Sequence, residues 1–129
     1  MNNEIPKIPA SEWEVMEVVW DTPGTSGVDV HERLGETNGW KLKTINSFLG
    51  RLVERKMLRA ERHGRAFRYW PIIERNQCVR VEGESFLNRI FKGKWTPMLV
   101  HFVEEANLSE TEIEELEDLI RKKKEEAAK

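Results

Sequence analysis

Cysteine is almost absent from this 129-residue chain, which limits the chemistry available to it. The single cysteine, Cys78, cannot form an internal disulfide or supply a Cys-x-x-Cys metal site. We expect it to be a small, half-buried apolar side chain. The histidines His31, His63 and His101 lie far apart and lack the spacing of metal ligands. We therefore expect no metal site and no cofactor.

Long apolar runs are also absent. No stretch approaches the roughly 20 apolar residues that a membrane-spanning helix requires. Residues 1–10 lack a cationic start followed by an apolar core, so we expect no signal peptide. A charged fraction of 34% beside 39% hydrophobic residues is typical of a soluble, helix-rich protein. These features predict a cytoplasmic protein.

Motifs that carry catalysis are missing too. The chain has no Gly-x-Ser-x-Gly sequence, no glycine-rich phosphate loop, and no Cys/His pair in a shared context. Its many carboxylates fall on predicted helix faces, where solvation is their ordinary role. We therefore predict that the protein is not an enzyme and has no catalytic residues.

What the chain does have is an uneven distribution of charge. Residues 1–40 carry two basic and eight acidic groups, and residues 76–129 carry nine and twelve. Between them, residues 41–75 carry ten basic groups and three acidic ones, a net charge of +7. The near-neutral total of −2 hides this cationic block. Such a block is typical of a surface that faces phosphate groups.

Capping signals predict where the first two helices begin. Ser11 and Glu14 have the spacing of a capping box, in which each side chain bonds the other residue's backbone amide. Ser26, with Asp29 three residues later, is a second predicted N-cap. We expect the second helix to end between residues 35 and 39.

A third helix and a hairpin follow. Residues 42–56 place four apolar side chains on one helical face: Ile45, Phe48, Leu49 and Leu52. Short strands at 57–62 and 66–72 are joined around Gly64, which can supply the positive φ of a tight turn. The order helix, helix, helix, hairpin predicts a winged helix-turn-helix within an α+β, mostly helical fold.

The opposite face of the third helix carries groups that can contact DNA. Asn46 can form two hydrogen bonds with adenine, and Lys43 can contact guanine or phosphate. Thr44 and Ser47 can bind phosphate or contact a thymine methyl group. Gly50 would mark close approach of the backbone, either to DNA or to a neighbouring helix. The alternative is that this face is only a solvated polar surface.

The hairpin tip argues against that alternative, because its basic side chains serve no core. They are Arg62, His63 and Arg65. We predict that they contact backbone phosphate or the minor groove. The residues leave two roles open for Arg51, a phosphate contact or an ion pair with Glu14 or Glu54.

Three further helices are expected after residue 74. Gly93 breaks the first, Pro97 lies near the start of the second, and Ser109 with Glu112 forms a capping box for the third. Their apolar stripes are too small to form a core alone, so we predict an isologous homodimer. The alternative is that these helices fold back onto the winged domain. The predicted interface residues are Phe86, Ile90, Leu99, Phe102, Ile113, Leu116 and Ile120.

These expectations divide the chain into a winged-helix DNA-binding domain, residues 1–73, and a helical dimerisation region, residues 74–129. The predicted partners are double-stranded DNA and a second copy of the chain. A winged-helix module that binds only other proteins is the alternative function. Salt-dependent and sequence-dependent DNA binding would distinguish the two.

Five segments resemble the penicillinase repressor family (BlaI/MecI type). They are SEWEVMEVVW (11–20), WKLKTINSFLGRLVERKML (40–58), FRYWPI (67–72), SFLNRIFKGKW (85–95) and LVHFVEEANLSETEIEELEDLI (99–120). The resemblance implies a dimeric winged-helix repressor of β-lactamase or penicillin-binding-protein genes, which binds palindromic operators with ACA/TGT half-sites and blocks promoter access. It also implies a membrane sensor–protease system that triggers cleavage of the repressor in its dimerisation region.

The resemblance assigns roles to individual residues. Family positions that contact bases or phosphates correspond to Lys43, Thr44, Asn46 and Arg51, and Lys41, also predicted to contact DNA, lies near the start of the same helix. Family members often carry Arg at the position of Asn46, which implies a different base preference here. The family's cleaved bond, often Asn-Phe, corresponds to His101–Phe102. A repressor that answers to a different signal is therefore a second alternative. The tail RKKKEEAAK lacks the cysteines of related copper-responsive repressors, so we expect no copper role.

Overall fold

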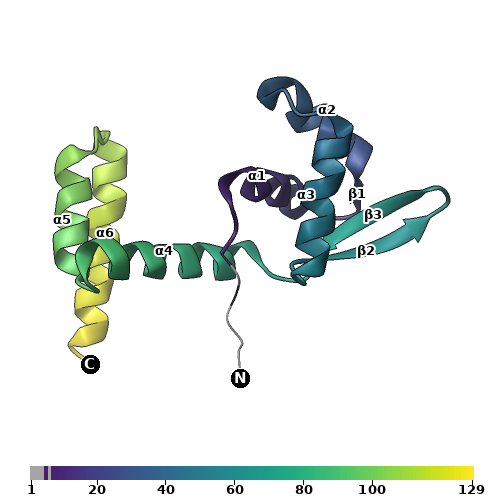
Figure 1. Cartoon of the computed structure of the whole chain (residues 1–129). Coiled ribbons are helices and arrows are strands. Elements are labelled where there is room, and N and C mark those ends of the chain that lie inside the picture. Colours follow the sequence, from purple (N-terminus) through teal and green to yellow (C-terminus); the bar gives the residue numbers. More distant parts are fainter. Residues whose placement is uncertain (1–4, 6) are drawn as a thin grey trace. The chain divides into compact units, whose positions relative to one another are not determined.

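The computed structural model describes residue 5 and residues 7–129, and six helices and three strands lie within that range (Figure 1). The predicted mostly helical α+β fold with a winged helix-turn-helix is confirmed. The chain forms two compact units, one that ends at Phe86 and one that spans Leu87–Lys129. None of the helices in the described range is both long and apolar enough to cross a bilayer.

Three helices build the core of the first unit: α1 (Ala10–Asp21), α2 (Gly27–Asn38) and α3 (Leu42–Glu54). Each contributes side chains with no exposed surface: Val15, Met16 and Val19 from α1, Val30 from α2, and Ile45, Leu49 and Leu52 from α3. The predicted apolar face of α3 is thus the buried face, apart from Phe48, which is partly buried and packs against the core. Burial of one face leaves the opposite face of α3 exposed to a ligand.

A small antiparallel sheet completes the first unit. Strands β1 (Thr25–Ser26), β2 (Leu58–His63) and β3 (Ala66–Pro71) lie in the order β1-β3-β2. The hairpin turn at Gly64 has a φ of +66°, as predicted. β1 was not predicted, because two residues are too few to show the alternation of a strand. It pairs Thr25 with Tyr69 and so attaches the wing to the start of α2.

The predicted helix starts were correct at two places and wrong at one. Ser26 with Asp29 and Ser109 with Glu112 both form capping boxes. At α1, however, the N-cap is Pro9, and Ser11 lies inside the first turn without a capping bond. The reason is that the Trp13 amide donates to the Pro9 carbonyl at 2.9 Å, so the helix starts at Ala10.

The beginning of α4 (Arg75–Phe91) belongs to the first unit. Cys78 is only 1% exposed and packs in the first unit's core, so it is fully buried rather than half-buried as predicted. Burial, with a smaller contribution from the negative charge of Glu82, raises the pKa of the thiol. The compact unit therefore extends beyond the predicted boundary at residue 73 and into α4.

The second unit contains the end of α4 together with α5 (Trp95–Glu105) and α6 (Glu110–Ala127). Gly93, with a φ of +80°, follows the end of α4, as the predicted helix break requires. Neither α5 nor α6 contains a buried residue. These two helices are therefore amphipathic elements whose apolar side chains remain accessible in the single chain.

Candidate nucleic-acid interface

The exposed face of α3 carries most of the side chains that were predicted to contact DNA. Lys41 is the N-cap residue of this helix and makes no capping bond through its side chain. Lys43, Asn46 and Ser47 are exposed, and Thr44 is half-buried. Two cations and two polar groups thus lie on the side of α3 that the core does not use. An α-helix with such a face fits the width of the DNA major groove.

The structure shows the surroundings of two residues on this face, Ser47 and Gly50. The Ser47 hydroxyl donates to the Lys43 carbonyl at 3.1 Å, so its oxygen can still accept from a ligand. Apart from Gly50's chain neighbours and the adjacent backbone of α3, no atom of the described residues lies within 4 Å of the position that a Gly50 Cβ would occupy. The suggestion that Gly50 permits close approach of a neighbouring helix is therefore wrong. Approach of DNA to Gly50 stays a prediction.

Arg51 has a different intramolecular partner from the two that were predicted. Its guanidinium lies 3.8 Å from the carboxylate of Glu12, and neither Glu14 nor Glu54 pairs with it. Arg55 bonds the same Glu12 carboxylate at 2.6 Å. Because Glu12 is only 2% exposed and is already bonded by Arg55, the longer Arg51 contact is the weaker one. Arg51 remains half-exposed and is still able to meet a phosphate.

Sequence reasoning missed Glu12, although a signal was present. Glu12 stands three, four and seven residues before Val15, Met16 and Val19, which places it on the buried face of α1. An acidic residue on an apolar face needs a basic partner. The partner, Arg55, is 43 residues away in sequence, so its identity could not be read from spacing.

The wing tip presents three basic residues in different states. Arg62 donates through Nε to the Gly64 carbonyl at 3.2 Å and lies 5.8 Å from the centre of the Phe67 ring. His63 lies 3.7 Å from the carboxylate of Glu61. Arg65 makes no hydrogen bond or ion pair with the part of the chain that the structure describes. Of the three, Arg65 is the one without a polar contact among the residues that the structure describes.

Contacts at the base of the wing hold the hairpin in place. Arg68 donates to the Gly24 carbonyl at 2.9 Å, in the turn that precedes β1. Arg59 pairs with Glu61 and lies 4.8 Å from the centre of the Trp70 ring. Sequence reasoning assigned no function to Arg59 or Arg68. Both basic residues stabilise the wing. Some of the positive charge of residues 41–75 is therefore used within the chain and not for binding an external ligand.

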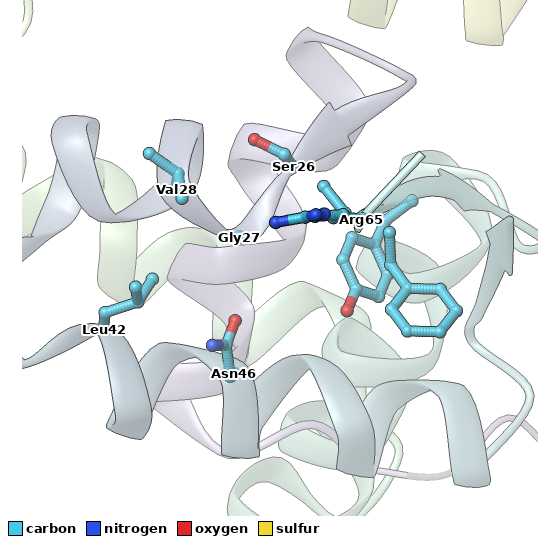
Figure 2. Close-up of a pocket in the computed structure, with 9 residues that line it drawn as sticks. Ser26, Gly27, Val28, Leu42, Asn46 and Arg65 are labelled. Carbon is cyan, nitrogen blue, oxygen red and sulfur yellow. The ribbon is translucent and has the colours of Figure 1, made fainter. Parts of the chain in front are cut away.

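An open pocket lies where the start of α2, α3 and the wing meet (Figure 2). Asn46 and Arg65, which were predicted separately, both line it. Gly27 and Tyr69 also line it, and burial raises the pKa of the Tyr69 hydroxyl. The remaining lining residues are Ser26, Val28, Leu42, Ala66 and Phe67. The fold thus brings the helix face and the wing tip to one surface.

Comparison with known proteins agrees with this geometry. Residues 8–122 match the family model described as penicillinase repressor. The chain is 36% identical over 121 residues to the penicillinase repressor of Bacillus licheniformis, which covers 94% of each protein. The solved DNA-binding domain of the repressor BlaI is similar to this chain with a TM-score of 0.52 and 35% identity, over 57% of this chain and 90% of that one. Monomeric Bacillus licheniformis BlaI in complex with the blaP half-operator gives a TM-score of 0.50 and 36% identity, over 57% and 89%.

Proposed function

The chain belongs to the penicillinase repressor family, and we propose that it represses transcription by binding a palindromic DNA operator as a homodimer. The observation that carries this proposal is the surface formed by α3 and the wing. There, Lys43, Asn46 and Arg65 are exposed on elements that match those of a repressor solved with its half-operator. A helix in the major groove with a wing beside it accounts for both sets of contacts.

The assignment of roles follows from chemistry at each position. Asn46 contacts a base edge, because a side-chain amide can hydrogen-bond base edges in the major groove. Phosphates carry the same negative charge whatever the base sequence, and basic side chains pair with them. We assign this role to Lys41, Lys43, Arg51 and Arg65. Thr44, Ser47, Arg62 and His63 complete the predicted set. Phosphate contacts supply affinity, and the base contact supplies preference.

The homodimer is supported by the apolar surface of the second unit. Six of the seven predicted interface residues are exposed in the single chain: Ile90, Leu99, Phe102, Ile113, Leu116 and Ile120. The seventh, Phe86, is half-buried. Apolar side chains gathered at helical spacing usually lie against a partner. An isologous dimer would cover them and would present two copies of α3 to the two halves of a palindrome.

Induction by a sensor–protease would act on α5. The predicted bond His101–Phe102 lies inside this helix, and the two rings contact each other and Phe91 with centroid distances of 5.4–6.2 Å. A helix holds its backbone bonds internally, so α5 would have to unwind locally before a protease could cleave there. Cleavage there would release residues 102–129 from the rest of the chain and so separate the winged-helix units of the two protomers.

Titration of DNA binding against salt tests the proposed function. The full chain is mixed with a duplex selected from the host genome and with a scrambled duplex of the same length, at several salt concentrations. We expect the logarithm of the binding constant to fall linearly with that of salt, with a slope of about −0.9 per phosphate contact. We also expect the selected duplex to bind much more tightly than the scrambled one. Binding at about micromolar Kd or weaker, equal for both duplexes, would instead favour a module that binds proteins.

A further inference from the structure

At the start of α2, Gly27 lies next to Asn46 of α3, the residue proposed to contact a base. A Cβ built on Gly27 would clash with the amide oxygen of Asn46, which is the atom nearest to that position. The Asn46 nitrogen is not among the three nearest atoms. Figure 2 shows the amide oxygen of Asn46 pointing toward Gly27 and the nitrogen pointing away. The missing side chain at Gly27 therefore leaves the space in which the Asn46 amide lies.

Electrostatics favours this orientation of the amide. Gly27 is the first residue of α2, whose N-cap is Ser26. Unpaired backbone amides at a helix N-terminus carry a partial positive charge, which attracts an oxygen more than an NH2 group. The guanidinium of Arg65 lines the same pocket and adds positive charge there. Both features favour the Asn46 oxygen on the α2 side, with its NH2 group on the other side.

We propose that Gly27 is a positioning residue that makes Asn46 a hydrogen-bond donor to the DNA base it meets. This proposal rests on the DNA-binding function proposed above. Guanine and thymine present the acceptors O6 and O4 in the major groove and adenine presents N7, whereas cytosine presents only the N4 donor. With its oxygen held toward α2, Asn46 donates to guanine, thymine or adenine and selects against cytosine. The two-bond adenine contact that the sequence suggests does not form.

The addition of a single methyl group at Gly27 tests this proposal. In Gly27→Ala the new methyl group displaces only the end of a flexible side chain, so the fold is retained and the Asn46 amide must rotate. Gly83→Ala is the matched control, because Gly83 also lies in a helix and nothing lies within 4 Å of its Cβ position. A comparison of the two variants separates the loss of space at Asn46 from the general effect of alanine in a helix.

The first measurement uses the free protein. Heteronuclear NMR of the full chain should show that Gly27→Ala shifts the side-chain NH2 resonances of Asn46, while Gly83→Ala leaves them unchanged. Unaltered Asn46 resonances in Gly27→Ala would overturn the proposal. This result does not depend on DNA, so it stands apart from the test of the repressor function.

The second measurement uses DNA. Binding sites for the wild type and for Asn46→Ala are selected from random duplexes. Asn46 contacts the base at the position where the wild type has a base preference and Asn46→Ala has none. At that position we expect guanine or thymine to bind about tenfold more tightly than cytosine, and adenine to bind no more tightly than guanine. Gly27→Ala should reduce the tenfold preference over cytosine to less than about threefold, and should have no effect there when Asn46→Ala is already present.

Two outcomes contradict the proposal. One is a wild-type preference for adenine at that position. The other is a Gly27→Ala effect of the same size with and without Asn46, which would mean that Gly27 acts on DNA directly. A wild type without sequence preference at any position would instead overturn the repressor function, and the positioning role would fall with it.

Discussion

The two compact units of the chain use the same kind of amphipathic helix with opposite results. In the first unit, α1, α2 and α3 bury their apolar faces against one another, and Leu49 has no exposed surface. In the second unit, α5 and α6 have equally regular apolar faces, yet Leu119 is 55% exposed and neither helix buries a residue. Helical periodicity predicts which face is apolar, but it does not predict what covers that face.

This contrast has a functional consequence. A closed core gives the proposed DNA-contacting face of α3 a rigid support, because buried side chains hold the helix from behind. An open apolar face can gain or lose a partner, and it therefore suits assembly and its control. We expect substitutions in the first unit to alter folding, and those in the second unit to alter association.

The largest effect is expected from a core truncation. Leu49→Ala removes a fully buried side chain from α3 and should lower the free energy of unfolding by about 2–5 kcal/mol. Denaturant unfolding followed by tryptophan fluorescence measures it, since four of the five tryptophans lie in the first unit. Leu119→Ala is the matched control in α6. If Leu49→Ala and Leu119→Ala lowered the free energy of unfolding equally at low protein concentration, this result would contradict the contrast between the buried core of the first unit and the exposed apolar faces of the second.

A substitution at the proposed interface should act on assembly instead. Leu116→Asp places a charge on the apolar face of α6, so sedimentation should show a monomer. A monomer loses the second half-site contact, and affinity for a full palindrome should fall about 100-fold. Affinity for a duplex with one half-site serves as the control and should not change. An unaltered sedimentation profile would place the interface elsewhere, including the alternative that the helices fold back onto the winged domain.

Helix caps allow a smaller test in both units. Ser26 and Ser109 each accept a hydrogen bond from the amide three residues later, at 3.2 and 3.1 Å. Replacement of either serine by alanine should cost about 1 kcal/mol of helix stability. Ser26→Ala should appear in the unfolding of the first unit, whereas Ser109→Ala should appear as a loss of helical circular dichroism. A loss of tryptophan-detected stability in Ser109→Ala would show that the two units unfold together.

Local patterns in the sequence predicted much of this fold. Two capping boxes, the glycine at the hairpin turn and the buried face of α3 depend on residues within a few positions of one another. The α1 start was wrong because Ser11 and Glu14 have the required spacing, but the backbone at Pro9 already begins the helix. Spacing indicates that a cap can form, and the preceding chain decides whether it does.

Contacts between distant segments could not be predicted in the same way. Glu12 with Arg55 and Arg68 with Gly24 join residues 43 and 44 positions apart, and only the folded chain brings them together. The clash between a Gly27 side chain and Asn46 is another such contact. The candidate site was therefore predictable as a list of exposed polar residues. The orientation of its central amide was not predictable, because it depends on another helix.

The smallest expected effect is a pH dependence that differs between the units. Hydrogen bonds from Arg75 hold the pKa of Glu17 below its ordinary value of 4.5, and bonds to Ser109, chiefly its backbone, lower the pKa of Glu112. A carboxyl whose pKa is depressed by folding stabilises the fold above about pH 4.5, and this contribution is lost as pH falls through the folded value.

Glu17 pairs with a residue 58 positions away, so Glu17→Gln should flatten the acid dependence of global unfolding in the first unit. Glu112 bonds only within its own cap, so Glu112→Gln should change the acid dependence of helix content alone. Equal flattening of tryptophan-detected unfolding by both variants would contradict the independence of the two units.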